Sequence, residues 1–134
     1  TGSQIRSDQD PVFHFYLQNQ DGVPVLGPED TSGYFVIDGT IALSSTTGDS
    51  PLYLNVDESA TASYKPLTLN TTATTTDWGL EGDTIITTDP RQLNFLVCAT
   101  SDANVWSVYL QEGNDVPSGE TCSNDISLHL PCLC

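Results

Sequence analysis

The sequence predicts an all-β fold, an antiparallel β-sandwich or barrel of about ten short strands. Apolar and polar residues alternate in short runs, which is the two-residue period of a strand with one buried face. Turn signals rich in Gly, Asp and Pro separate these runs at intervals of about eight to twelve residues. No window of 11 residues places apolar residues at the i, i+3, i+4 and i+7 positions of an amphipathic helix. We therefore expect almost no helix.

The first half of the chain contains five of the expected strands. The aromatic-rich run VFHFYLQ at 12–18 lies between Pro11 and the turn signal NQDG and predicts the first strand. The segment GYFVIDGTIALSS predicts two strands joined at Asp38–Gly39, because Asp-Gly is a strong signal for a tight hairpin turn. PLYLNV predicts the next strand. ASYKPLTLN predicts another, in which Pro66 marks an edge or a bend because proline cannot donate to a strand ladder.

The second half predicts a further hairpin in TDWGLEGDTIITT, with its turn at 81–83, and then strands in QLNFLVCA, VWSVYLQ and DISLHL. The regions YFVIDGTIALSS…PLYLNV and WGLEGDTIITT…LNFLVC resemble two copies of one unit, so a three-fold β-trefoil is the alternative architecture. We prefer the sandwich or barrel, because the chain after Cys98 is short and has too few strands for a third copy.

Length and charge limit the organisation and the partners. The 134 residues fit a single domain, which we expect over residues 11–134, after a flexible N-terminal lead-in over residues 1–10. Eighteen acidic residues face three basic ones, for a net charge of -15. This charge disfavours nucleic acid and anionic membrane surfaces as partners. Such a charge is consistent either with a need for solubility or with an acidic working environment. No apolar run approaches the roughly 20 residues of a membrane-spanning helix.

Cysteines and a sequon indicate the compartment. Four cysteines and the sequon NTT at Asn70 predict a secreted, extracellular glycoprotein. No charged-then-apolar leader is present, so we expect that any secretion signal has been removed. Three of the cysteines, Cys122, Cys132 and Cys134, lie in the last 13 residues. Four cysteines allow three pairings, and the spacing alone leaves all of them open.

The sequence offers little for catalysis or for metal binding. His14 and His129 lie opposite apolar neighbours in strand runs, so we expect both to face solvent or an edge. No G-x-S-x-G elbow and no zinc-ligand spacing is present. We expect the terminal CLC to be oxidised rather than metal-bound. Carboxylates cluster on turns, but none follows the calcium-loop rule; they are Glu29, Asp30, Asp57, Glu58, Glu81 and Asp83. We therefore expect no catalytic residue, no metal site and no cofactor.

Aromatic residues suggest a carbohydrate site as one alternative. Trp78, Tyr34 and Tyr53 are the candidate binding residues, because aromatic rings stack on sugar faces. Trp106 and Tyr109 fall on opposite faces of their strand, so at least one of them is expected in the core. A small acid-active glycoside hydrolase is a second alternative. It needs a pair of carboxylates across a cleft, and so many acids supply no specific signal for one.

The C-terminal third, LEGDTIITTDPRQLNFLVCATSDANVWSVYLQEGNDVPSGETCSNDISLHL, carries a family resemblance. A strand ending in F-x-x-C precedes an aromatic strand, and a second cysteine opens the next strand. This order resembles the C-terminal domain of fungal PIR-type cell wall mannoproteins and the related PhiA-like secreted cell wall proteins. The matching residues are Phe95, Cys98, Trp106, Tyr109 and Cys122. The resemblance implies a cell-wall-associated structural protein without catalytic activity, with wall polysaccharide as a partner.

The resemblance also implies that Cys98 pairs with Cys122. Cys132 and Cys134 would then bridge each other or join a second chain, and the rival pairing ties Cys98 and Cys122 separately to the tail. The chain departs from PIR proteins in two ways, since it has no glutamine-rich repeat and no cysteine before the F-x-x-C strand. Covalent attachment to wall glucan is therefore not expected.

Overall fold

The computed structural model describes residues 2–44, 51–89 and 91–130. Within these ranges it contains fourteen strands and one 3-10 turn and no α-helix. In chain order the elements are β1 (Arg6–Ser7), β2 (Tyr16–Gln20), β3 (Val23–Gly27), η1 (Glu29–Thr31), β4 (Phe35–Asp38), β5 (Thr40–Leu43), β6 (Leu52–Val56), β7 (Tyr64–Asn70), β8 (Trp78–Glu81), β9 (Thr84–Thr88), β10 (Arg91–Gln92), β11 (Phe95–Ala99), β12 (Trp106–Gln111), β13 (Cys122–Ile126) and β14 (Leu128–His129).

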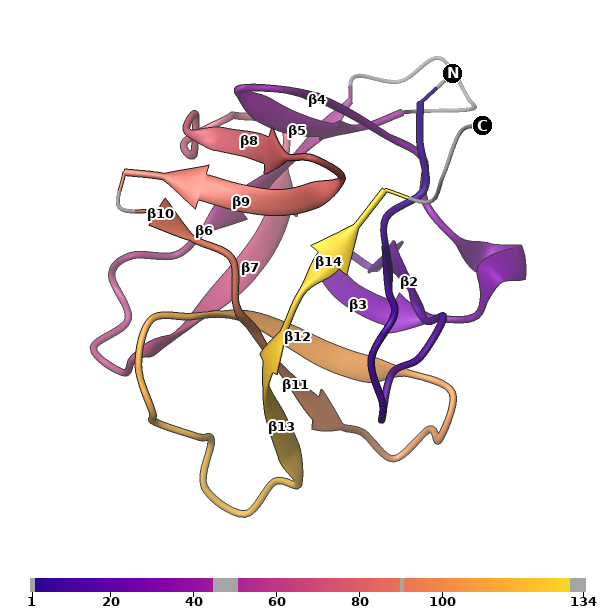
Figure 1. Ribbon diagram of the computed structural model, residues 1–134, viewed down its shortest axis with the longest axis vertical. Helices are drawn as coiled ribbons and strands as arrows, with labels where there is room; N and C mark the ends of the chain where they lie inside the picture. Colours follow the sequence, from indigo (N-terminus) through magenta and orange to yellow (C-terminus); the bar gives the residue numbers. More distant parts are fainter. Residues whose placement is uncertain (1, 45–50, 90, 131–134) are drawn as a thin grey trace.

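The strands form one antiparallel sheet that curls into a nearly closed barrel (Figure 1). The main path of described strands runs β10-β9-β14-β1-β2-β3-β12-β7-β6-β5-β4, while β8 pairs with β9 and β11 lies between β12 and β13. An isolated bridge between Gly39 and Trp78 brings β8 against the β4–β5 hairpin, which draws the two ends of the path together. Of the architectures expected from the sequence, the barrel is therefore the one that forms.

Both predicted hairpins are confirmed. Gly39 forms the turn between β4 and β5 with a φ of +72°, and Gly82 lies between β8 and β9 with a φ of +63°. A positive φ costs glycine nothing because it has no Cβ, whereas other residues are strained there. The two glycines therefore fix the turns at the positions that the sequence indicated.

The aromatic run at 12–18 is only partly a strand, which corrects the expectation. Residues 12–15 form a turn, His14 has a φ of +60°, and β2 begins at Tyr16. The amide of Val12 donates to the carbonyl of Gln9, and the amide of Phe15 donates to the carbonyl of Val12. These local bonds replace a strand ladder. Val12 is buried completely, whereas Phe13 is 52% exposed.

The division between a lead-in and a domain also needs correction. Ile5 is fully buried in the core, and Ser3 forms an isolated bridge with Phe35. The two residues of β1 pair with β14, and Arg6 also pairs with Tyr16 of β2. The N-terminal segment is thus a strand of the barrel. Its polar composition concealed this role, because Ile5 is the one apolar side chain that it contributes to the core.

The core fills the interior of the barrel with side chains from most of the strands. Burying an aliphatic or aromatic side chain of this kind contributes roughly 1.5–3 kcal/mol. The largest fully buried residues are Phe35, Phe95, Ile5, Leu17, Leu26, Ile41, Leu54, Ile85, Leu96, Leu110, Ile126 and Leu128.

Candidate functional site

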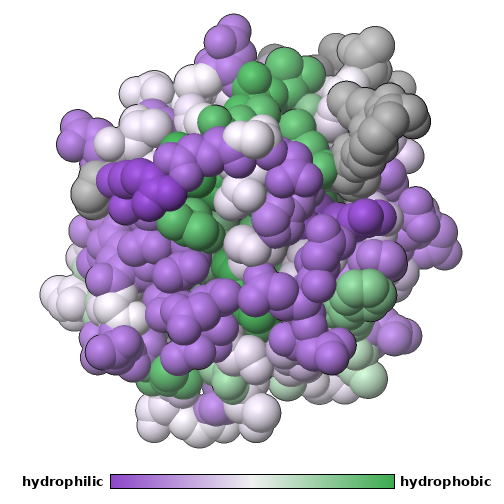
Figure 2. All heavy atoms as spheres, viewed as in Figure 1, coloured by the Kyte–Doolittle hydropathy of each residue, from purple (hydrophilic) through white to green (hydrophobic). Residues whose placement is uncertain are grey.

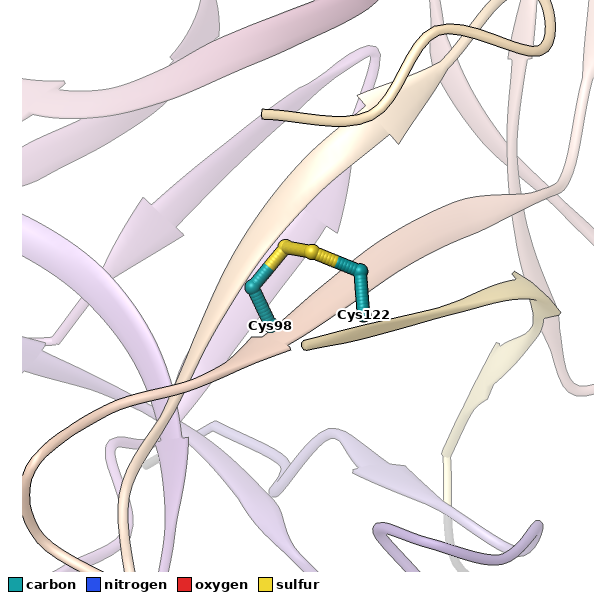
Figure 3. Close-up of a disulfide and its surroundings, with 2 residues drawn as sticks. All are labelled: Cys98 and Cys122. Carbon is teal, nitrogen blue, oxygen red and sulfur yellow. A yellow bond between two sulfur atoms is a disulfide. The ribbon is translucent and has the colours of Figure 1, made fainter. Parts of the chain in front are cut away.

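Cys98 and Cys122 form a disulfide between neighbouring strands (Figure 3). The two residues lie directly opposite each other in the register of β11 and β13, with their Cα atoms 4.0 Å apart. The bond closes a loop with a sequence separation of 24, which contains β12. The pairing implied by the family resemblance is therefore present. Cys132 and Cys134, the remaining cysteines, lie outside the described residues.

Trp78 does not form part of a sugar platform, because it is a core residue. Its side chain is 3% exposed, and its indole Nε1–H donates to the backbone carbonyl of Leu54 at 2.9 Å. An indole that is buried and hydrogen-bonded in this way cannot stack on a ligand. The proposed role of Trp78 in carbohydrate binding is thus corrected.

The two tyrosines proposed with Trp78 are not brought into contact with each other. Tyr34 is 50% exposed just before β4, and Tyr53 is half-buried on β6. Within the described residues, the ring contacts join Phe13 to His14 and Tyr64 to Tyr109. The register pairs Val36 with Ala42 and Ala42 with Tyr53, so Tyr34 and Tyr53 lie on one face of the sheet, and their role in carbohydrate binding stays a prediction.

The two aromatic side chains of β12 lie on opposite faces of the strand, and both are half-buried. Trp106 packs against the core, and Tyr109 meets Tyr64 edge-on with 5.3 Å between the ring centroids. Burial, the charge of Glu120 and the neighbouring Tyr64 raise the pKa of Tyr109. Because Trp106 and Tyr109 are both partly covered, neither presents an open ring for a ligand.

A small apolar patch interrupts the otherwise largely hydrophilic face near β4 and β8 (Figure 2). Val36 is 48% exposed and Leu80 is 41% exposed, and both line a shallow hollow of about 230 Å³ with Leu130. The exposed side chains here are aliphatic. They offer neither an aromatic face nor a polar group to orient a sugar, so this patch does not replace the expected platform.

Asn70 stands at the end of β7 and is exposed. Its Oδ1 accepts a hydrogen bond from Nδ2 of Asn55 at 2.9 Å, while its own Nδ2 has a long contact of 3.5 Å with Oγ1 of Thr68. The amide nitrogen that a glycan would modify is thus on the surface and weakly engaged. Glycosylation of Asn70 stays a prediction.

An acidic groove of about 330 Å³ opens where β6, β9 and β12 end. Four carboxylic acids and three threonines supply most of its lining, with two apolar side chains at its base. The lining residues are Val56, Glu58, Thr74, Thr75, Asp77, Thr87, Asp89, Leu110 and Glu112. We refer to this hollow as the acidic groove.

The pKa of one carboxyl group of the acidic groove is raised. Burial raises the pKa of Glu112, the charge of Glu58 raises it further, and Lys65 partly opposes both effects. The nearby negative charge of Glu58 disfavours the charged form of Glu112, so Glu112 holds its proton more tightly than an ordinary glutamic acid.

Two other acidic residues of the predicted turns have local partners. Asp57 accepts hydrogen bonds from the amide and the hydroxyl of Ser59, and these bonds lower its pKa. Glu81 forms an exposed ion pair with Arg91 that lowers the pKa of Glu81. Across the part of the chain that the structure describes, no group of three or more His, Cys, Asp or Glu side chains is placed to hold a metal ion.

The two histidines have different surroundings. His14 is exposed on the 12–15 turn, stacks on Phe13 and has Nε2 3.6 Å from Asp8. His129 is half-buried at the end of β14. Its Nε2 lies 2.8 Å from Oγ of Ser127, and its Nδ1 lies 3.2 Å from Oδ1 of Asp83. We call Ser127, His129 and Asp83 the serine-histidine relay.

Sequence reasoning missed this relay and treated His129 as a surface residue. The S-x-H spacing of Ser127 and His129 was a visible signal, because residues two apart share one face of a strand. Asp83 left no such signal, since it is 46 residues from His129 in sequence. Only the pairing of β14 with β9 brings the two together.

Comparison of the chain with models of known protein families, with curated proteins and with solved structures found no match. The resemblance to PIR-type and PhiA-like proteins therefore stays a prediction. Among the described residues, no helix has the length and apolar character needed to cross a membrane.

Proposed function

We propose that this chain is a secreted structural protein of the fungal cell wall, whose disulfide-braced barrel serves as a scaffold. The observation that carries the proposal is the bond between Cys98 and Cys122. Structural disulfides persist in oxidising compartments and are rare in the cytosol. The same bond joins the two cysteines that match the order of the wall-protein families.

Two further features support an extracellular scaffold. The sequon residue Asn70 is exposed and so accessible to a glycosyltransferase. The net charge of -15 falls in magnitude in an acidic environment, where carboxylates take up protons and their mutual repulsion decreases.

Fractionation of a fungus that expresses a tagged copy tests this proposal. We expect the tagged chain in the isolated wall fraction, with a glycan-dependent mass that Asn70→Gln removes. A Thr68→Ala variant, which keeps the sequon, is the matched control and should retain the glycan. Recovery of the chain only from the cell interior would contradict the proposal.

Carbohydrate binding in the acidic groove is the second candidate function. The groove presents carboxylate and hydroxyl groups that can accept and donate hydrogen bonds to sugar hydroxyls. We expect Asp89→Asn and Glu112→Gln to weaken retention of the protein on insoluble glucan or chitin. Glu29→Gln, on η1 and outside the groove, should leave retention unchanged. Equal retention of all variants would exclude the groove.

The glycoside hydrolase alternative receives less support from this groove. Retaining enzymes separate their two carboxyl groups by roughly 5 Å, and inverting enzymes by roughly 6.5–9.5 Å. Burial and the charge of Glu58 raise the pKa of Glu112. This shift alone assigns neither spacing to the pair, so we propose binding rather than hydrolysis of a polysaccharide there.

A further inference from the structure

The serine-histidine relay joins two segments that are distant in sequence, 127–129 and the turn that holds Asp83. Ser127 precedes β14, His129 ends it, and Asp83 lies in the two-residue turn between β8 and β9. The pairing of His129 with Thr84 sets β14 beside that turn, and the amide of Leu130 donates to the carbonyl of Asp83 at 2.8 Å. The backbone pairing at His129 and Leu130 therefore holds the three side chains close together.

The partners of His129 determine where its proton lies. A carboxylate can only accept a hydrogen bond, so the contact of Nδ1 with Asp83 places the ring proton on Nδ1. Oγ1 of Thr84, 3.2 Å from the same nitrogen, can accept from it as well. Nε2 is then unprotonated and lies 2.8 Å from Oγ of Ser127. This is the arrangement that a general base needs to take a proton from a serine.

The amide of Gln9 completes the surroundings of Ser127. Its Oε1 accepts from the backbone amide of Ser127 at 2.7 Å and from the hydroxyl of Ser127 at 2.9 Å, which fixes the orientation of the amide. Because the hydroxyl has one proton, it has to turn from Gln9 toward Nε2 of His129 before His129 can take that proton. Nε2 of Gln9 donates to the carbonyl of Asp125 at 3.1 Å.

Exposure and charge favour a neutral substrate. The side chain of His129 is 20% exposed and that of Asp83 is 63% exposed, so solvent and small molecules reach the relay. The net charge of -15 repels anionic substrates.

We propose that Ser127 and His129 are a nucleophile and general base that cleave small uncharged carboxylic esters, with Asp83 as a positioning residue. Oγ of Ser127 attacks the carbonyl carbon while its proton passes to Nε2 of His129. The bond to the leaving alcohol breaks, and the alcohol takes that proton from His129. Water, activated by His129, then attacks the acyl-serine and releases the acid. The sum of the steps is ester plus water giving acid plus alcohol. This activity goes beyond the proposed wall function. It also gives the chain a catalytic residue, which the sequence did not lead us to expect.

Phosphonylation of the unmodified protein tests the nucleophile without any substitution. An alkyl fluorophosphonate should phosphonylate Oγ of Ser127 as the phosphorus–fluorine bond breaks and fluoride leaves. Peptide mapping by mass spectrometry locates the adduct. We expect one adduct per chain, on Ser127. A protein that stays unlabelled, or an adduct that maps to another residue, overturns the proposal.

Hydrolysis of p-nitrophenyl acetate tests the base and the positioning residue. We expect Ser127→Ala and His129→Gln each to lower the rate above buffer by at least about 100-fold, within the range for acid–base catalysis. His14→Gln is the matched control, because the ring of His14 also lies beside an aspartate but stacks on Phe13, whereas that of His129 contacts a serine hydroxyl. It should change the rate less than twofold. Equal losses for His14→Gln and His129→Gln would show background imidazole catalysis and overturn the proposal.

Asp83→Asn distinguishes positioning from folding. We expect it to lower kcat with little change in KM, and Asp83→Glu to restore part of kcat. Circular dichroism melting of each variant shows whether the barrel remains folded. If Asp83→Asn leaves kcat unchanged in a folded protein, Asp83 does not position His129.

Discussion

Nε1 of Trp78 donates a hydrogen bond to the backbone carbonyl of Leu54 at 2.9 Å, which ties β8 to β6 inside the barrel. Trp78 also forms the isolated bridge with Gly39. The residue therefore stabilises the place where the two ends of the strand path meet. Its role in the fold explains why the indole of Trp78 is unavailable to a ligand.

Replacement of Trp78 should destabilise the protein strongly. We expect Trp78→Ala to lower the free energy of unfolding by about 3–5 kcal/mol, because it leaves a large cavity and an unpaired carbonyl on Leu54. Urea denaturation followed by circular dichroism measures the change. Tyr34→Ala, at a half-exposed site, should stay within about 0.5 kcal/mol. A Trp78→Ala protein as stable as the wild type would contradict the core assignment.

Asn55 organises the loop that follows the sequon. It is 2% exposed, and its Oδ1 accepts from the backbone amides of Thr74 and Thr75 at 2.9 and 3.1 Å. We expect Asn55→Leu to cost about 2–4 kcal/mol, because it removes the acceptor of two backbone amides. Hydrogen exchange should quicken at both threonines. Asn104→Ala, at an exposed loop position, serves as the control; unchanged exchange in Asn55→Leu would refute this role.

The raised pKa of Glu112 predicts a pH-dependent effect on stability. The pKa of Glu112 in the folded state is raised above its ordinary value of 4.5. The fold thus favours the protonated form of Glu112. The resulting contribution to the free energy of unfolding is fully present below about pH 4.5 and is lost as the pH rises through the raised pKa of the folded state.

Glu112→Gln mimics the protonated carboxyl and should remove this loss. We expect the variant to be more stable than the wild type at pH 7, by up to about 0.5 kcal/mol as is usual at a surface position, and equal to it near pH 3. Chemical denaturation across this pH range measures the difference. A variant that is less stable at pH 7 would show that the two carboxylates do not repel.

The disulfide should contribute much of the stability. In the chain-entropy model, a disulfide that closes a loop of this size raises the free energy of unfolding by roughly 3–4 kcal/mol. We expect the double variant Cys98→Ser, Cys122→Ser to lose about that amount in guanidinium denaturation and to melt at a lower temperature. Reduction of the wild type should produce a similar change. An unaltered midpoint would mean that the bond does not brace the barrel.

Turn chemistry made much of the strand order predictable. The hairpins at Gly39 and Gly82 could be located because glycine is the residue that adopts their positive φ without strain. Pro66, which the sequence indicated as an edge or a bend, lies where β7 changes its pairing strand. Tyr64 to Pro66 pair with β12, and Leu67 to Asn70 pair with β6.

Contacts between distant segments explain what could not be predicted. His14 lies in an aromatic run with high strand propensity, yet local hydrogen bonds and the burial of Val12 turn the backbone there. Ile5 looked isolated because its neighbours in the core come from other strands. The relay depends on the approach of Asp83 to His129, which no spacing along the chain encodes. The acidic groove likewise gathers Glu58, Asp77 and Glu112 from three separate loops.

Peptide mapping of the native protein without reduction is the most direct measurement of the central claim, a barrel braced by one specific bond in an oxidising compartment. It should recover a peptide pair that joins Cys98 to Cys122. Recovery of Cys98 as a free thiol, or joined to Cys132 or Cys134, would contradict it.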